Sequence, residues 1–272
     1  MKEALVGLLA RTGRDLRPAV AREWLQAAIL DSLGRSGSLV WLAFHGGTAI
    51  RFLYGIARFS EDLDFTHEGP EPAARLLPSL GSLKGDLWRE MIPVRVDLAE
   101  RPRLVEVRLD FKALAAELGL AAPELRVKIE INTDPPRRGV TMVSVTTRYR
   151  ALRIPHHDPA TLFAGQLHAV LMRHYTKGRD LYDLMWYLGR PRWPDPNLDF
   201  LNDALKRSGW SKAALNGSTW LAAVQGRLAA TDWKRVRADV APFLETPEEA
   251  SLLTEDVFQD LLERRRLRGP RR

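Results

Sequence analysis

The chain has 272 residues, no cysteine and 45% hydrophobic residues, and its lysines and arginines exceed its aspartates and glutamates by seven. The length allows one large domain or two modest ones, and this composition can bury a core, which argues against disorder. The lack of cysteine excludes disulfide frameworks, thiolate zinc sites and cysteine nucleophiles, and it is most compatible with a reducing cytoplasm. The positive surplus favours a phosphate-bearing partner without identifying one.

Nothing in the sequence indicates export or membrane insertion. The N-terminal apolar run contains charges and lacks the small-residue cleavage pattern of a secretion signal. No run of about eighteen apolar residues occurs anywhere in the chain. We therefore expect a cytoplasmic protein without a membrane span.

Helix and strand patterns alternate over the first half of the chain. Helical stretches show apolar residues at helical spacing, and strands show alternation or a short apolar run. The predicted elements are, in chain order, a helix over 18–33, a strand over 39–44, a helix over 48–55 after the pair Gly46-Gly47, a strand over 58–65, two strands within 91–111 joined near Arg101-Pro102, and a strand over 125–132. A mixed sheet flanked by helices is therefore expected.

The pattern changes near residue 155. Residues 160–262 carry helical patterns interrupted by 191–197, and they contain few β-branched residues. We therefore predict an α+β chain with two domains, a sheet domain over 1–155 and a helical domain over 156–272.

Acidic residues on two predicted strands indicate a metal site. Side chains alternate between the faces of a strand, so Asp62 and Asp64 share one face, and Lys128 and Glu130 share a face of another strand. Carboxylates held close together repel unless a cation neutralises them, and Mg²⁺ prefers oxygen ligands. Three carboxylates can hold two such ions. Two alternatives stay open: the aspartates as a solvated strand face, and Glu130 in a cross-strand ion pair with an arginine.

A glycine pair precedes these acids. Gly46 and Gly47 lie at a predicted strand-to-helix turn, where backbone N–H groups can approach an anion, and Thr48 adds a hydroxyl. A phosphate site beside a metal site suggests a nucleoside triphosphate (NTP) as substrate.

The order of these motifs resembles the AbiEii/AbiGii nucleotidyltransferase toxins, which include the MenT-like toxins of the DNA polymerase β-like superfamily. The motifs are GGT at 46–48, RFSEDLDF at 58–65, KIEIN at 128–132 and KGRDLYDL at 177–184. The resemblance implies a minimal nucleotidyltransferase sheet followed by a helical domain. It further implies Mg²⁺-dependent transfer of a nucleotide from an NTP, with a tRNA 3′ end as acceptor, and a cognate antitoxin protein.

The resemblance also assigns roles by position. It makes Asp62, Asp64 and Glu130 the metal-binding and catalytic acids, with Asp180 as a further catalytic residue from the helical motif. We expect phosphate contacts from Gly46, Gly47, Thr48, Arg58, Ser60, Lys128 and Lys177. On a helix over 179–188, a buried stripe of three leucines and Met185 would leave Asp180 and Asp183 on another face. Asp183 could equally be an acid that favours the helix dipole.

Two positions depart from the family pattern. His45 stands where many relatives have a lysine before the glycine pair, and Gln166 stands where relatives commonly have a lysine that contacts the nucleotide. Gln166 carries no charge. Either His168, Arg173 or Lys177 replaces it, or the NTP is held differently, or activity is reduced.

Three other features have simpler interpretations. Residues 62–66 match the DxDxT pattern of phosphatases, but no buried hydrophobic strand precedes Asp62. His156 and His157 would face opposite ways on an extended chain, which predicts a surface linker rather than a metal site. The last nine residues contain six arginines, which predict a solvated tail, although such a tail could also follow an RNA backbone.

The sequence therefore predicts a nucleotidyltransferase that uses Mg²⁺ to transfer nucleotides from an NTP to RNA, with tRNA as the favoured acceptor. It would act as the toxin of a toxin–antitoxin or phage-defence system. Two alternatives remain open, namely transfer to a protein hydroxyl and a non-catalytic relative that binds RNA or nucleotides.

Overall fold

The computed structural model describes residues 2–69, 77–121 and 125–268. The chain divides into two compact units. The sheet unit comprises Met1–Gly55, Phe59–Pro135 and Thr141–His156, and the helical unit comprises Ile56–Arg58, Pro136–Val140 and His157–Arg272. The α+β class predicted from the sequence is confirmed. Because each unit is built from several stretches of chain, the predicted division into 1–155 and 156–272 stays a prediction.

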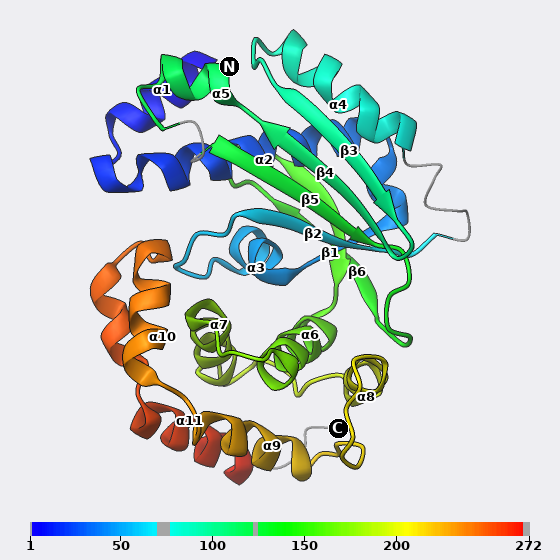
Figure 1. Ribbon diagram of the computed structural model, residues 1–272, viewed down its shortest axis with the longest axis vertical. Helices are drawn as coiled ribbons and strands as arrows, with labels where there is room; N and C mark the ends of the chain where they lie inside the picture. Colours follow the sequence, from blue (N-terminus) through cyan, green and yellow to red (C-terminus); the bar gives the residue numbers. More distant parts are fainter. Residues whose placement is uncertain (1, 70–76, 122–124, 269–272) are drawn as a thin grey trace. The chain divides into compact units, whose positions relative to one another are not determined.

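A seven-stranded mixed sheet forms the centre of the sheet unit, with strand order β3-β4-β5-β2-β1-β7-β6 (Figure 1). Strands β2 and β5 pair in parallel, whereas β4 pairs antiparallel with β5. The strands are β1 (Leu42–His45), β2 (Asp62–His67), β3 (Arg95–Arg101), β4 (Leu104–Asp110), β5 (Arg126–Asn132), β6 (Thr141–Thr146) and β7 (Leu152–His157). Strands β3 and β6 are therefore the two edges.

Alternation gives the central strands one apolar and one polar face. Leu63 and Phe65 of β2 are completely buried, as is Ile129 of β5, and Phe65 stacks on Phe44 with ring centroids 5.0 Å apart. Figure 1 shows α2 and α4 alongside β3 to β5. The helices of this unit are α1 (Lys2–Ala10), α2 (Arg17–Arg35), α3 (Gly46–Tyr54), α4 (Leu77–Arg89) and α5 (Lys112–Glu117). Burial of the apolar face leaves the opposite face of β2 and β5 to polar side chains.

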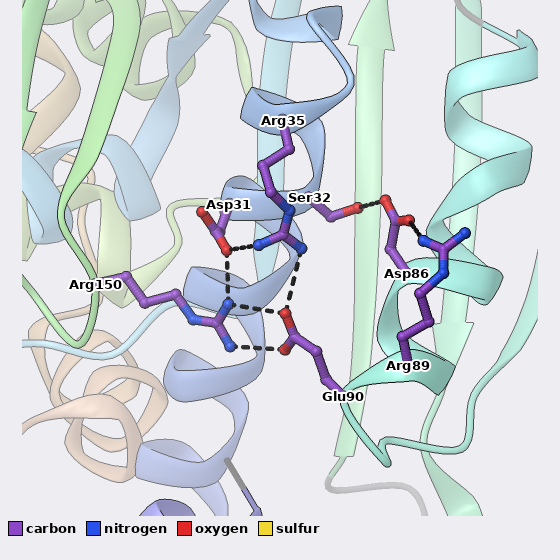
Figure 2. Close-up of polar contacts among 7 residues, drawn as sticks. All are labelled: Asp31, Ser32, Arg35, Asp86, Arg89, Glu90 and Arg150. Atoms are coloured by element: carbon purple, nitrogen blue, oxygen red, sulfur yellow. Dashed lines mark hydrogen bonds and ion pairs between the residues drawn. The ribbon is translucent and has the colours of Figure 1, made fainter.

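A charged cluster ties α2 to α4 and to the segment before β7 (Figure 2). Arg150 donates to Asp31 Oδ2 at 2.8 Å and to Glu90 Oε2 at 2.9 Å, and Arg35 donates to Glu90 Oε1 at 3.2 Å. Ser32 Oγ donates to Asp86 Oδ2 at 2.5 Å. These polar contacts join segments far apart in the sequence, so they fix how the helices lie beside the sheet.

The helical unit is built around aromatic side chains. Phe163 stacks on Tyr187 with centroids 4.9 Å apart, and Trp220 contacts Phe163 edge to face at 5.6 Å. Side-chain caps begin several helices: Asp158, for example, accepts from Thr161 N at 2.8 Å. The helices are α6 (Pro159–Met172), α7 (Gly178–Leu188), α8 (Leu198–Arg207), α9 (Thr219–Leu228), α10 (Trp233–Val240) and α11 (Glu255–Leu267). Among the described residues, no helix has the length and apolar character needed to cross a membrane.

Several local predictions need correction. Residues 38–41 form a 3-10 turn, so the first strand begins only at Leu42, where pairing with β2 starts. The sequence pattern also missed β6 and β7. His156 and His157 are buried in β7 rather than lying in a surface linker. The start of the predicted arginine tail belongs to α11, where Arg265 is buried against Asp195 at 2.9 Å, and residues 269–272 lie outside the described residues.

Candidate active site

The polar face of β2 and β5 carries three of the predicted acids in register. The Cα partners across this parallel pair are Asp62 with Lys128 and Asp64 with Glu130. All four residues lie on the same face, because partners in a ladder share a face and alternate residues of one strand do too. The sheet therefore brings Asp62, Asp64, Lys128 and Glu130 together, as their spacing in the sequence suggests.

The neighbouring strand β4 adds two charged residues that the sequence analysis did not single out. Glu106 is the Cα partner of Glu130, and Arg108 is the partner of Lys128. The face thus contains an acidic rung of Asp64, Glu130 and Glu106 across three strands. The alternation of β4 places Glu106 and Arg108 on one face, but which residues they oppose depends on a pairing register that a single strand does not reveal.

Lys128 neutralises part of this acidic surface. Its Nζ lies 2.8 Å from Glu130 Oε1 and 3.5 Å from Asp62 Oδ2. Partial burial opposes the charged ammonium, but the hydrogen bond to Glu130 and the charge of Asp62 raise the pKa of Lys128. Burial raises the pKa of Asp62, although Lys128 acts in the opposite direction. Glu130 therefore pairs with a lysine of its own strand, and not with an arginine across the sheet.

Glu106 is the most deeply buried acid of the acidic rung, at 5% exposure. Its Oε1 atom lies 2.6 Å from an Nη atom of Arg108, but it accepts no hydrogen bond of good geometry. A carboxylate directly opposite another carboxylate is unfavourable in a sheet. The acidic rung is therefore an energetically costly arrangement, which Lys128 and Arg108 from the adjacent rung partly offset.

The glycine turn fits closely against Asp64. Gly46 has a φ of +72°, which favours glycine, and a Cβ atom at this position would clash with the Asp64 carboxylate. The turn begins α3, so the backbone N–H groups of Gly47 and Thr48 belong to its first turn. The turn therefore places a helix N-terminus beside an acid of the acidic rung, as a phosphate site next to a metal site requires.

Two hydrogen bonds hold the strand that carries the aspartates. Thr48 is completely buried, and its hydroxyl donates to the Asp62 carbonyl oxygen. Gln26 of α2 is buried too, and its Nε2 donates to the Ser60 carbonyl oxygen at 3.0 Å. The Thr48 hydroxyl thus fixes the start of β2, and Gln26 is a supporting residue for which the sequence offers no local signal.

The remaining predicted residues belong to the helical unit. Arg58 and Asp183 are both buried and form a two-pronged ion pair. Asp180 accepts from Arg173 Nη1 at 2.5 Å, and burial raises its pKa while Arg173 opposes that rise. Lys177 is the N-terminal cap residue of α7. Both aspartates of the motif are therefore buried and paired, and the catalytic role of Asp180 stays a prediction.

Gln166 and Gly178 also have structural partners. Gln166 Nε2 donates to the Asp180 carbonyl oxygen at 2.8 Å, which fixes the first turn of α7. Gly178 N donates to Asp239 at 2.6 Å, and a Cβ atom on Gly178 would clash with the Val236 carbonyl oxygen. Of the residues considered as replacements for the family lysine, Arg173 is the one that contacts Asp180.

Within the described residues, no three His, Cys, Asp or Glu side chains form a group that could hold a metal ion. Asp62 and Glu130 lie on either side of the Lys128 ammonium instead. The metal-binding role of Asp62, Asp64 and Glu130 and the phosphate contacts of Gly46, Gly47, Thr48, Arg58, Ser60, Lys128 and Lys177 stay predictions.

A mixed sheet bearing paired carboxylates beside a glycine turn is a nucleotidyltransferase-like arrangement. Residues 28–264 match the family described as "Nucleotidyl transferase AbiEii toxin, Type IV TA system". The chain therefore belongs to the AbiEii nucleotidyltransferase toxin family, and the family resemblance read from the motifs is confirmed. No curated protein matches the chain.

Two solved structures from Helicobacter pylori have a similar fold. The crystal structure of JHP933 is 19% identical, with a TM-score of 0.51 over 92% of this chain and 94% of that one. A second crystal structure has the same identity and TM-score, over 93% of this chain and 98% of that one. Identities at this level show the fold alone.

Proposed function

We propose that the chain transfers a nucleotide from an NTP to an RNA acceptor, with tRNA as the favoured RNA, and that it does so as the toxin of a toxin–antitoxin pair. The family supplies the class, a nucleotidyltransferase toxin. The observation that carries the proposal is the acidic rung, in which Asp64 and Glu130 are in register beside the Gly46 turn. Such a surface suits a substrate that arrives with its own cations.

The donor chemistry suits Mg²⁺, although in the described residues of the free chain the acids do not form a three-ligand group. Asp62, Asp64 and Glu130 offer only carboxylate oxygens, which are the ligands this ion prefers. The Lys128 ammonium already lies between Asp62 and Glu130, so the surface accommodates a cation in the free chain. Bound Mg²⁺ would neutralise charge on the transferring phosphoryl group and activate the attacking hydroxyl. Nucleotidyltransferases of this kind generally use an NTP and a divalent metal, and we extend that requirement to this chain.

The protein's own groups would then orient the triphosphate. The first N–H groups of α3 can donate to its oxygens, and Gly46 keeps that approach open. Lys128 can exchange its carboxylate partners for a phosphate, since its flexible side chain has three donors. The charge of +7 would attract the RNA acceptor around this acidic centre. The NTP and RNA substrates would place the reaction in the cytoplasm, where a cognate antitoxin would hold it in check.

The test is the transfer of labelled nucleotide by the full chain. Each labelled NTP is incubated with Mg²⁺ and either total RNA or a protein fraction. We expect label in RNA of tRNA size, and a loss of about a thousandfold or more in Asp64→Asn, because that change removes one metal ligand without changing side-chain shape. Asp110→Asn is the matched control: Asp110 shares the polar face through β4 and pairs with Arg126 outside the acidic rung. Unchanged transfer by Asp64→Asn would refute the site.

A second candidate, a non-catalytic relative, is favoured by one observation. Gln166 stands at the position of the family lysine and is engaged with the Asp180 carbonyl oxygen, which is a structural contact. If this candidate is right, the chain should bind RNA, should incorporate no label into it, and should show no saturable binding of NTP and Mg²⁺. Label in the protein fraction alone would favour transfer to a protein hydroxyl.

A further inference from the structure

The two edges of the sheet differ in charge. Strand β3, at one edge, contains Arg95, Asp97, Glu100 and Arg101 among its seven residues. Charges of this kind protect an edge from pairing with other chains. Strand β6, at the other edge, has the sequence TMVSVT and carries no charge. One edge is thus protected in the usual way and the other is not.

Strand β6 also exposes apolar side chains. Val145 is 70% exposed, Val143 is 45% exposed and Met142 is 40% exposed. Val143 and Val145 share a face, since they are two residues apart on a strand. Apolar residues beside a row of unpaired backbone groups are what an added strand would cover. The side chains and the edge therefore indicate the same kind of ligand, an extended polypeptide.

The edge is already held in strand geometry. Ser144 Oγ lies within hydrogen-bond distance of His156 Nε2 on β7, at 2.8 Å. Thr146 is buried, and its hydroxyl donates to the Phe52 carbonyl oxygen of α3 at 2.8 Å. A partner would therefore not have to order this strand, which lowers the entropic cost of binding.

The charge around β6 indicates what such a polypeptide contains. Residues 135–157 include five arginines and no aspartate or glutamate. Three of these arginines already have acidic partners. Arg138 pairs with Asp199, Arg148 pairs with Glu23, and Arg150 pairs with Asp31 and Glu90, as Figure 2 shows for Arg150. Arg153 of β7 is exposed and makes no ion pair within the described residues; it lies on the face opposite Ile154 and His156, which is the face of Val143 and Val145. A strand with acidic flanks would complement this edge.

We propose that β6 is a docking edge for an extended segment of another protein, with apolar residues at its centre and acidic residues at its ends. The segment adds an eighth strand to the sheet and covers Val143 and Val145. A second copy of this chain fits less well, because its residues 135–157 contain no acid that could face Arg153 across two paired β6 strands. This proposal goes beyond the transfer reaction, and its test does not require the chain to transfer nucleotides.

The probe is a fluorescein-labelled peptide of alternating valine and threonine with glutamates at both ends, and its comparison peptide carries lysines in place of the glutamates. Fluorescence anisotropy with the full chain measures both affinities. We expect the acidic peptide to bind and the basic peptide to bind at least about tenfold more weakly. Amide hydrogen exchange of residues 141–146 should slow only when the acidic peptide is present.

Two variants locate the contact. Val145→Asp puts a negative charge where the added strand would lie and should weaken the acidic peptide about tenfold or more. Leu98→Asp is the matched control, because Leu98 is 41% exposed on the opposite edge strand β3 and should leave binding unchanged. Circular dichroism and thermal unfolding establish that both variants fold.

Other outcomes would overturn the proposal. Equal affinities for the acidic and the basic peptide would show that charge does not select the ligand. If neither peptide bound, β6 would not be a docking edge. A dimer in sedimentation equilibrium that Val145→Asp abolishes would make a second copy the occupant. Protection of residues 141–146 by an RNA oligonucleotide, with displacement of the peptide, would make the edge a nucleic-acid surface.

Discussion

Carboxylates in the sheet unit are held in two different ways. Glu23 of α2 is 2% exposed and accepts from Arg51 at 2.6 Å, from Arg148 at 2.8 Å and from Tyr149 at 2.8 Å. The acidic rung places Glu130 between two further carboxylates and leaves it about one-third exposed beside Lys128. The first arrangement surrounds one acid with donors, whereas the second places three acids opposite one another on adjacent strands. Buried charge surrounded by donors belongs to the architecture, and carboxylates held opposite one another are what a cationic ligand would neutralise.

The largest effect on stability should come from breaking the arrangement around Glu23. Glu23→Ala leaves the buried Arg51 without its closest carboxylate, which should lower the free energy of unfolding by about 3–5 kcal/mol. Urea denaturation measures the change. Asp64→Asn, in the acidic rung, should change the same quantity by less than about 1 kcal/mol. Equal losses in the two variants would show that the acidic rung is as much a part of the architecture as Glu23.

The arrangement around Glu23 should also determine part of the acid stability. Burial acts to raise the pKa of Glu23, but the hydrogen bonds and charges of Arg51 and Arg148 outweigh it and lower the pKa below its ordinary value of 4.5. A lowered pKa contributes stability above the unfolded-state value, and this stability is lost as the pH falls through the folded-state value. The free energy of unfolding should therefore decrease as the pH is lowered from 4.5.

The control for that prediction is a pair of variants. Glu23→Gln should flatten the acid limb of the stability curve, because it removes the titrating group while retaining much of the hydrogen bonding. Glu100→Gln, at an exposed position of β3, should leave the slope unchanged. The prediction fails if the slope of Glu23→Gln matches that of the unmodified chain in urea titrations between pH 3 and 6.

Whether a residue of these two arrangements could be found from the sequence depends on how far along the chain its partners lie. Alternation along β2 predicts that Asp62 and Asp64 share a face, and alternation along β5 predicts the same for Lys128 and Glu130, because it depends only on neighbours along one strand. Glu106 was missed because its place opposite Glu130 is set by the register of β4 against β5, which is a long-range property. Glu23 gives no signal either, since its partners Arg51 and Arg148 come from distant segments.

The same reasoning applies to the fold. Helices with clear periodicity, such as 18–33, appear as predicted, because the pattern reports burial of one side. Strand β7 was missed because Pro155 and two histidines occupy a short segment that only its neighbours identify as a strand. The motif 177–184 was placed correctly on a helix, but the burial of Asp183 against Arg58 depends on a residue far away in the sequence.

A moderate effect is expected at Lys128, the cation beside the acidic rung. Lys128→Met removes the ammonium between Asp62 and Glu130, which should lower the unfolding free energy by about 1 kcal/mol without divalent cations. Thermal unfolding in MgCl₂ should restore that loss, whereas NaCl of equal ionic strength should restore less, because a divalent ion can take the place of the lysine. Arg126→Met, on the same face of β5 and paired with Asp110, is the control without a specific Mg²⁺ response. If MgCl₂ and NaCl restored the stability of Lys128→Met equally, no specific Mg²⁺ site would lie at the position of the Lys128 ammonium.

The smallest effect should come from Glu106, and its sign distinguishes the two arrangements. Glu106→Gln removes a carboxylate directly opposite Glu130 while keeping the shape of the side chain, so the unfolding free energy should rise by a few tenths to about 1 kcal/mol. If the acidic rung attracts cations, Glu106→Gln should also weaken the binding of Mn²⁺, a spectroscopic substitute for Mg²⁺, by about two- to fivefold. Titrations followed by electron paramagnetic resonance measure this affinity. Glu100→Gln, outside the acidic rung, should change neither quantity. A loss of stability in Glu106→Gln would instead mean that the 2.6 Å contact with Arg108 outweighs the repulsion from Glu130, and Glu106 would then belong with Glu23 among the acids of the architecture.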